Sequence, residues 1–278
     1  MRHAYDVETV RAAEQALMAR LPEGTLMRRA AAGLAVACGD LLRRTGRVYG
    51  SRVLLLVGSG DNGGDTLYAG AALARRGAGV RAVLTAPDKA HPGGLAALRA
   101  AGGQAIDAPG DLGAVDLVVD GITGIGGRGG LRPDAERLVR EATAGRAPVL
   151  AVDLPSGVEA DTGQVRGPAV RADATVTFGT YKPGLLIDPA AEYAGAVHLV
   201  DIGLGPELPA RPDLEALQYA DVAALLPVPT GESDKYRRGV VGWRPAPSGI
   251  RARPSWPSRA RCTAERARSG TPVRARTR

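Results

Sequence analysis

A glycine-rich segment that carries two acids is the first place where this sequence could do chemistry. It reads GSGDNGGDT and spans residues 58–66, directly before a predicted helix. Tight glycine turns aim backbone N–H groups into one concavity, and a helix N-terminus adds partial positive charge, so such a loop can hold a phosphate. The segment is not a P-loop, because no Lys follows, and its spacing differs from G-x-G-x-x-G. Asp61 and Asp65 would repel a bare phosphate, so we expect them to face hydroxyl groups, backbone donors or a cation.

Two further acids come at the ends of apolar runs. Asp120 opens the segment DGITGIGGRGG, and Asp153 opens DLPSG. In an open α/β sheet, ligands bind outside the carboxyl ends of the strands, near the point where the strand order reverses. We therefore expect residues 58–65, 120–130 and 153–157 to lie on one edge. A single Asp in such a place is often only a turn or helix cap, and a glycine-rich loop can be only a turn. Three polar strand ends together favour a binding site.

The elements that must position these loops follow from the hydrophobic pattern. The run RVLLLVG at residues 52–58 is apolar throughout, as is typical of a strand buried on both faces of a parallel sheet. Strands and helices then alternate, which predicts a doubly wound, Rossmann-like parallel sheet with helices on both faces, of the α/β class. The further predicted strands are 80–85, 114–120, 148–155, 173–179 and 195–200, and the helices between them are 63–77, 93–102 and 133–144.

Two helices precede the first of these strands, at residues 6–20 and 24–44. Asp6 is the expected N-cap of the first, and Val10, Ala13 and Leu17 share one of its faces. The two helices must pack on their own sheet or on a partner chain. They are apolar enough to contribute to a homodimer, and burial on their own sheet explains them equally well.

The charge of the chain is unevenly distributed. The whole chain of 278 residues carries a net charge of +7, but residues 243–278 hold ten Arg and a single acid, Glu265. Subtracting that tail leaves residues 1–242 with a net charge of −2, so the high isoelectric point gives no argument for nucleic-acid binding by the body. The tail is rich in Arg, Pro and Ser, shows neither helix nor strand period, and is expected to be disordered.

The cysteine and histidine content argues against a disulfide framework and against a zinc site. Cys38 and Cys262 are the only cysteines, too few for a disulfide framework, which indicates a reducing compartment. The three His residues are widely spaced, so no zinc site is expected. No apolar run approaches the roughly 20 residues that span a bilayer, and the N-terminus lacks the features of a signal peptide. We expect a cytoplasmic protein with no membrane association.

Four motifs, in order along the chain, resemble those of one enzyme family. GSGDNGGD at residues 58–65, DGITGIGGRGGLRP at 120–133, AVDLPSG at 151–157 and TFGTYKPGL at 177–185 are similar to the N-terminal YjeF-type domain, the NAD(P)H-hydrate epimerase family. LMRRAAAGLA at residues 26–35 also fits the helical segment that opens that domain. The resemblance covers about residues 5–210.

The resemblance implies an isomerase of nicotinamide nucleotide repair. The family interconverts the R and S forms of hydrated NADH or NADPH, which carry a hydroxyl at C6 of the nicotinamide ring, and so presents a dehydratase with the epimer that it accepts. It implies potassium ligands at Asn62, Asp120 and Ser156, whose hard oxygen atoms suit a hard cation. The substrate-binding residues that it implies are Asp61, Asn62, Gly63, Gly64, Asp65, Gly124, Ile125, Gly126, Gly127, Arg128, Gly129, Gly130 and Asp153.

Loss of configuration at C6 needs either departure of the hydroxyl or ring opening and reclosure. Both routes need a positioned acid/base, for which Asp153 is our candidate. The alternative is that Asp153 only hydrogen-bonds the ribose or the carboxamide. Lys182 matches the family motif and either contacts phosphate, holds its loop or is a solvated surface charge. The sequence departs from the family at Asp61, usually Asn, and at Thr66, usually Gly, and both changes are expected to weaken binding.

The sequence divides into three expected parts. Residues 1–225 form the YjeF-type domain, 226–242 are a linker with the remnant start of a dehydratase domain, and 243–278 are the tail. The segment SDKYRRGVVG at 233–242 resembles the opening of that second domain, so a frameshifted or truncated bifunctional protein without dehydratase activity is expected. A basic, nucleic-acid-binding arm is the alternative for the tail. For the body, the alternative is a non-catalytic nucleotide-binding or interaction module.

Overall fold

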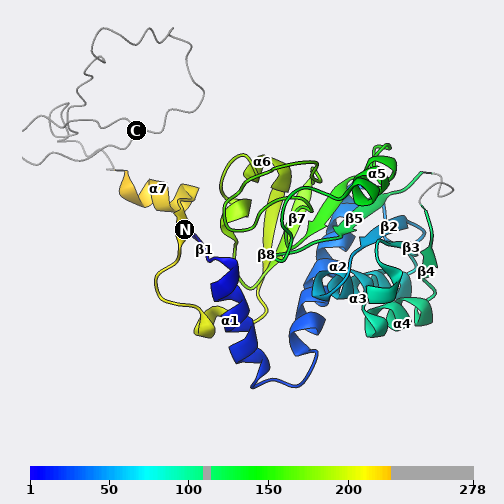
Figure 1. Cartoon of the computed structure of the whole chain (residues 1–278), viewed down its shortest axis with the longest axis horizontal. Helices are drawn as coiled ribbons and strands as arrows, with labels where there is room; N and C mark the ends of the chain where they lie inside the picture. Colours follow the sequence, from blue (N-terminus) through cyan, green and yellow to red (C-terminus); the bar gives the residue numbers. More distant parts are fainter. Residues whose placement is uncertain (109–113, 227–278) are drawn as a thin grey trace, which may run out of the picture. The chain divides into compact units, whose positions relative to one another are not determined.

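The computed structural model describes residues 1–108 and 114–226 of the chain (Figure 1). Residues 1–217 form one compact unit, and a second unit begins at Gln218 and contains the short helix α7 (Tyr219–Leu225). The expectations for residues 227–242 and for the tail at 243–278 lie outside the described residues. None of the described helices is long and apolar enough to cross a membrane.

A parallel sheet of seven strands, in the order β4-β3-β2-β5-β6-β7-β8, forms the centre of the first unit (Figure 1). All of its strand pairs are parallel, which confirms the predicted doubly wound α/β fold. The chain order reverses between β2 and β5, which are hydrogen-bonded neighbours. The strands are β2 (Arg52–Val57), β3 (Gly79–Leu84), β4 (Gln104–Ile106), β5 (Leu117–Gly121), β6 (Val149–Val152), β7 (Ala174–Phe178) and β8 (Ala196–Val200).

Helices cover both faces of this sheet. Helices α2, α3 and α4 lie on one face and α5 lies on the other (Figure 1). The alternation of side chains along β2 separates the two cores, because Leu55 belongs to the cluster shared with α2 and α3, whereas Leu54 and Leu56 belong to the cluster shared with α5. The helices are α2 (Thr25–Thr45), α3 (Asp61–Arg75), α4 (Pro92–Ala100), α5 (Pro133–Ala142) and α6 (Ala191–Ala194), with 3-10 turns η1 (Pro87–Lys89), η2 (Pro183–Leu185) and η3 (Gly205–Glu207).

Helix α1 (Val7–Met18) begins as the sequence predicts. The carboxylate of Asp6 accepts a hydrogen bond from the Thr9 N–H, and Val10, Ala13 and Leu17 are buried. A small antiparallel sheet precedes it, in which β1 (Arg2–Ala4) pairs with β9 (Leu214–Ala216). No local pattern indicates this pairing, since it joins residues far apart in the chain and each strand is short.

Helix α2 packs against its own sheet. Leu34 and Cys38 are fully buried in the core cluster that includes the strands, and a Cβ on Gly33 would lie 2.4 Å from Val200 of β8. Burial raises the pKa of the Cys38 thiol to about 12, as suits a structural cysteine. Helix α2 therefore buries one face on its own sheet, and the homodimer stays a prediction.

Candidate active site

Two glycine-rich loops meet at the point where the strand order reverses. The Gly58 N–H donates a hydrogen bond to the Gly121 carbonyl at 3.0 Å. A Cβ on Gly58 would lie only 1.8 Å from the Ile122 carbonyl oxygen, so no other residue fits there without moving the backbone. The loops that follow β2 and β5 are thereby held together at the carboxyl edge, where open α/β sheets bind ligands.

The first loop runs straight into helix α3. The helix begins at Asp61, earlier than the predicted start at residue 63, because Gly60 is its N-cap. Asp61 is exposed, while Gly63, Gly64 and Asp65 are buried. The sequence motif therefore forms the first turns of a helix rather than an open loop, and it places one acid outside and one inside.

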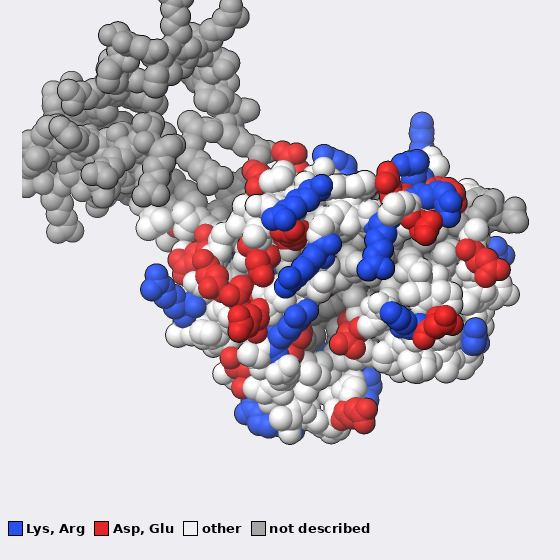
Figure 2. Space-filling model, viewed as in Figure 1, with Lys and Arg blue, Asp and Glu red and all other residues white. Residues whose placement is uncertain are grey.

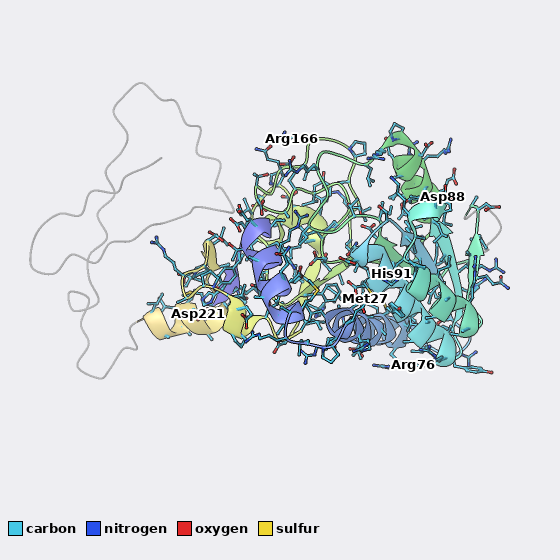
Figure 3. All side chains as sticks on the ribbon, turned by 60° about the horizontal axis from the view of Figure 1, so that its bottom comes forward. Met27, Arg76, Asp88, His91, Arg166 and Asp221 are labelled. Atoms are coloured by element: carbon cyan, nitrogen blue, oxygen red, sulfur yellow. The ribbon has the colours of Figure 1, made fainter. Side chains whose placement is uncertain are left out.

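Two side chains close over this helix start. A Cβ on Gly64 would lie 2.9 Å from Met27 Cε and 3.0 Å from His91 Cδ2, and Figure 3 shows Met27 and His91 near each other beside α3. His91 is fixed in turn, because its Nδ1 accepts a hydrogen bond from the Gly94 N–H at 3.0 Å at the start of α4. Glycine at position 64 thus lets α2 and α4 shield the loop from one side.

Asp120 and Ser156 form a buried hydrogen-bonded pair between the ends of β5 and β6. Ser156 donates from its hydroxyl to Asp120 Oδ1 at 2.7 Å and from its N–H to Oδ2 at 2.8 Å. The Ser156 hydroxyl also accepts from the Thr123 N–H at 2.9 Å, which fixes the turn after β5. Burial raises the pKa of Asp120 to about 6, against the lowering effect of the Ser156 and Ile122 hydrogen bonds.

Asn62 lies beside the same turn and is incompletely hydrogen-bonded. A Cβ on Gly124 would lie 3.1 Å from Asn62 Oδ1, and the buried Asn62 Nδ2 has no partner among the described residues. A buried amide without partners usually marks the place of a bound group. Asp120 is fully buried and has no cationic partner in the described part of the chain. The oxygen donors of Asn62, Asp120 and Ser156 therefore suit a hard cation.

Asp153 lies at the end of β6 in a strained conformation. Its φ of 66° makes it the only non-glycine residue with a positive φ among residues 1–108 and 114–226, a geometry that costs about 1–3 kcal/mol and concentrates at functional sites. The Lys182 ammonium donates to Asp153 Oδ1 at 2.5 Å, and the Thr177 hydroxyl donates to the same oxygen at 3.0 Å. Both donors reach Oδ1, which leaves Oδ2 for a ligand.

Lys182 is buried, so the interpretation of this residue as a solvated surface charge is wrong. Its side chain is 2% exposed, and the ammonium also donates to Thr177 Oγ1 and to the Phe178 carbonyl, both at 3.0 Å. All three donor positions are thus used inside the protein. Lys182 holds the segment after β7 to Asp153, as one of the sequence-based alternatives expected.

Three more carboxylates surround this ion pair. Burial raises the pKa of Asp65 well above its usual range, and the charges of Asp153, Asp61 and Glu14 raise it further. Burial also raises the pKa of Glu14, on α1; the charges of Lys182 and Arg11 oppose that shift, and those of Asp153 and Asp61 add to it. The Oδ1 atom of Asp65 is buried and has no hydrogen-bond partner among the described residues. Proton binding is therefore favoured in the immediate neighbourhood of Asp153.

A cavity of about 670 Å³ opens at Arg11, one turn of helix α1 before Glu14. It lies between the start of α1, the loop after β5 and the segment 159–166, within the size range of small-molecule sites. Figure 2 shows Lys and Arg side chains in line across the middle of the molecular face, with acidic side chains beside them. The cavity is lined by Val7, Arg11, Ile125, Gly126, Gly127, Arg128, Gly129, Glu159, Ala160, Asp161, Thr162 and Arg166.

The predicted site residues thus fall into two neighbouring groups. Residues 61–65, Asp120, Asp153 and Ser156 surround the strand ends, while residues 125–129 line the cavity. Gly124 lies against Asn62, and Gly130 lies against the backbone of Gly167. Helix α1 also lines the cavity through Val7 and Arg11, although its sequence pattern predicted only a packing role. The signal was present in Arg11 and Glu14, which are one turn apart and follow Val7 along the same side of the helix.

Comparison with known proteins places this geometry in a family. A family model described as YjeF-related protein N-terminus matches residues 23–184. The chain is 50% identical over 243 residues to the bifunctional NAD(P)H-hydrate repair enzyme Nnr of Mycobacterium tuberculosis, covering 87% of this chain and 50% of that protein. It is 44% identical over 215 residues to the NAD(P)H-hydrate epimerase of Microbacterium testaceum, covering 74% of this chain and 80% of that protein.

The chain spans about half the length of the bifunctional relatives that it matches. Among solved structures, it is similar to the yeast protein ynu0 (YNL200c), with a TM-score of 0.59 over 70% of this chain and 86% of that one. The sequence identity to the yeast protein is 18%, so this likeness concerns the fold alone.

Proposed function

The chain belongs to the YjeF-related N-terminal family, and on that premise we propose that it interconverts the R and S forms of hydrated NADH and NADPH. The relative from Microbacterium testaceum, whose name states this activity, is matched over 80% of its length. The observation that carries the proposal is the pairing of Asp153 with buried Lys182, next to a cavity large enough for a nucleotide.

Asp153 is the acid/base of the proposed reaction. In the first route the C6 hydroxyl takes up a proton and leaves as water, which produces a C6=N1 iminium, and water then adds to the other face of C6 and gives up a proton. In the second route the C6–N1 bond breaks, the hydroxyl becomes an aldehyde by losing its proton, N1 takes up a proton, and reclosure on the other face reverses these transfers. Both routes thus move the proton of the C6 oxygen. Asp153 Oδ2 supplies or accepts that proton, since Oδ1 is held by Lys182 and Thr177. Lys182 and the positive φ of Asp153 fix the direction of the carboxylate, which is a positioning role.

Asn62, Asp120 and Ser156 would hold a potassium ion at the turn after β5. Such an ion would supply positive charge beside the buried Asp120 carboxylate. In its absence, the chain's own residues still order the turn, since Ser156 bridges Asp120 and Thr123. An enzyme of the dehydratase class would consume the epimer that this reaction presents.

The test is an epimerisation assay on the purified chain. Isolated R-hydrate of NADH is incubated in potassium buffer, the S form is followed by chromatography, and spontaneous epimerisation is subtracted. Conversion well above that background, lost in Asp153→Asn, is the expected result. Unchanged conversion in Asp153→Asn would remove Asp153 as the acid/base. No conversion by the unaltered chain, with nucleotide still bound, would instead favour a non-catalytic nucleotide-binding module.

A further inference from the structure

We propose that Arg11 of helix α1 and Arg128 of the loop after β5 bind the pyrophosphate of the dinucleotide in the cavity beside Asp153. This inference rests on the proposed function and adds to it a place for the substrate's phosphates. It assigns the phosphates to the cavity instead of to the N-terminus of α3, where the glycine-rich motif first suggested them.

The start of α3 is poorly suited to two phosphate charges. Asp61 is in the first turn of the helix, and Asp65 follows one turn later, close enough to Asp61 and Asp153 for their charges to interact. An anion at this helix start would gain from the helix dipole, worth about 0.3–1 kcal/mol at a surface. The same anion would be repelled by several carboxylates, and the stabilisation from the helix dipole is too small to offset that repulsion.

The cavity, in contrast, presents two guanidinium groups that form no ion pair with an acid among the described residues, although the charge of Arg11 also acts on Glu14, one turn further along α1. Arg11 and Arg128 are both exposed, and neither makes a hydrogen bond or an ion pair with any residue in the described ranges. A Cβ on Gly126 would lie 3.4 Å from Arg11 Nη2, so the glycine loop brings its backbone close to that guanidinium. Planar guanidinium groups bind phosphate oxygens in a bidentate manner, which suits a pyrophosphate.

Arg166 also lines the cavity but is differently placed. Its Nε donates to Gln164 Oε1 at 2.7 Å and lies 3.3 Å from Glu159 Oε1. The charge of Arg166 is therefore already balanced by Glu159. Figure 3 shows Arg166 on the outer side of the loops. Asp161 is likewise occupied, because its Oδ1 accepts from the Val7 N–H at 2.8 Å. Among the described Arg residues that line the cavity, Arg11 and Arg128 are therefore the two without a hydrogen-bonded or ion-paired partner.

Helix α1 also gives the order in which the substrate would lie. Arg11 lines the cavity, and Glu14 interacts with Asp153 and Lys182 at the carboxylate centre. The two positions are separated by about 4.5 Å along the helix axis, given a rise of about 1.5 Å per residue. A nicotinamide ring at Asp153 would thus have its ribose and phosphates directed along α1 toward Arg11. The hydrogen bond from Val7 to Asp161 anchors the helix in that position.

The experiment compares two probes on the full chain. Binding of NADH and of reduced nicotinamide riboside, which lacks phosphate, is measured by calorimetry for the unaltered chain, Arg11→Gln, Arg128→Gln and the double variant. Arg137→Gln on the surface of α5 is the matched control. We expect each single change to weaken NADH binding roughly 10-fold, the range for one charge-assisted contact. Riboside binding should stay unchanged, and the salt dependence of NADH binding should fall in the double variant.

Several results would overturn the inference. These are unchanged NADH binding in the double variant, an equal loss for the riboside, or no NADH binding by the unaltered chain at millimolar concentration. The proposed function fails separately. NADH binding that depends on the two arginines, without epimerisation, would contradict the proposed function and support the phosphate site. Epimerisation with an unchanged KM in the double variant would support the proposed function and contradict the phosphate site.

Discussion

Lys182 and Asp153 form an ion pair with a 2.5 Å contact that is almost completely shielded from water, between the segment after β7 and the end of β6. Two charges in such a place are stable only together, because each has lost its hydration and depends on the other. The pair also holds Asp153 in its left-handed backbone conformation. Position, charge and direction of the candidate acid/base therefore all depend on one lysine.

The first prediction follows from this dependence. Lys182→Met should lower the free energy of unfolding by about 3–5 kcal/mol, because it leaves a buried carboxylate without its partner. Asp153→Asn should destabilise the chain for the same reason, with Lys182 unpaired. The double variant should be less destabilised than the sum of the two, which chemical denaturation of all four proteins would measure. Additive losses would mean that the two charges do not depend on each other.

A second prediction concerns the contact between the two glycine-rich loops. Gly58→Ala forces a Cβ toward the Ile122 carbonyl oxygen, so the backbone must move. We expect a loss of about 1–3 kcal/mol in unfolding free energy. We also expect a fall in epimerisation, because both loops shift. Gly145→Ala is the control, since a Cβ there meets nothing within 4 Å. Equal melting temperatures and activities for the two variants would contradict this reasoning.

Most of the sheet could be predicted because its strands carry long apolar runs. β2 is recognisable locally because residues 53–57 are all apolar and buried, and β5 because three apolar residues precede Asp120. β7 contains two Thr residues, but it is recognisable by its β-branched and aromatic side chains. Strand β4 spans only residues 104–106, too short to give a pattern, and the β1–β9 pairing joins the two ends of the compact unit. Such elements are decided by tertiary contacts and carry no local signal.

The candidate site divides in the same way. Asp120, Asp153 and Ser156 were expected at one edge because each follows an apolar strand, and the hydrogen bonds of Ser156 to Asp120 confirm that the two strand ends meet. The burial of Lys182 could not be predicted, since its partner lies 29 residues away in sequence. The role of α1 was missed because a helix face with charged residues usually faces solvent.

Asp61 offers a third prediction. This exposed acid interacts unfavourably with the carboxylates of Asp65 and Glu14, at a position where the family resemblance leads us to expect Asn. Asp61→Asn should therefore lower the KM for the hydrated dinucleotide by about 2–5-fold, the effect of one solvent-screened charge. This decrease in KM should be smaller in an assay at about 200 mM salt than in one at about 20 mM salt, because salt screens the exposed charge. Asp88→Asn, on an exposed turn, should change neither value, and an unaltered KM for Asp61→Asn at low salt would refute the argument.

A fourth prediction tests the potassium ligands through stability. If Asn62, Asp120 and Ser156 bind the ion, raising potassium at constant ionic strength with a bulky organic cation should raise the melting temperature. Ser156→Ala should abolish that rise and cost about 1–3 kcal/mol, because Asp120 and the Thr123 N–H lose a partner. Thr143→Ala, which removes a hydroxyl bonded to a helix carbonyl on α5, should keep the rise. A potassium effect that persists in Ser156→Ala would place the ion elsewhere.

The buried carboxyl of Asp65 leads to a prediction about pH. Its pKa in the folded chain lies well above 3.8, chiefly because it is buried, so the folded state keeps this proton to a higher pH than the unfolded state does. Between about pH 4 and the folded pKa, the unfolded state gains from ionisation, and the free energy of unfolding falls as pH rises. Asn at this position carries no such proton. The melting temperature of Asp65→Asn minus that of the unaltered chain should therefore increase with pH from about 4 upward. Asp88→Asn is the control for an exposed acid, and a difference that is flat or decreasing with pH would show that Asp65 ionises as readily in the folded chain as in the unfolded one.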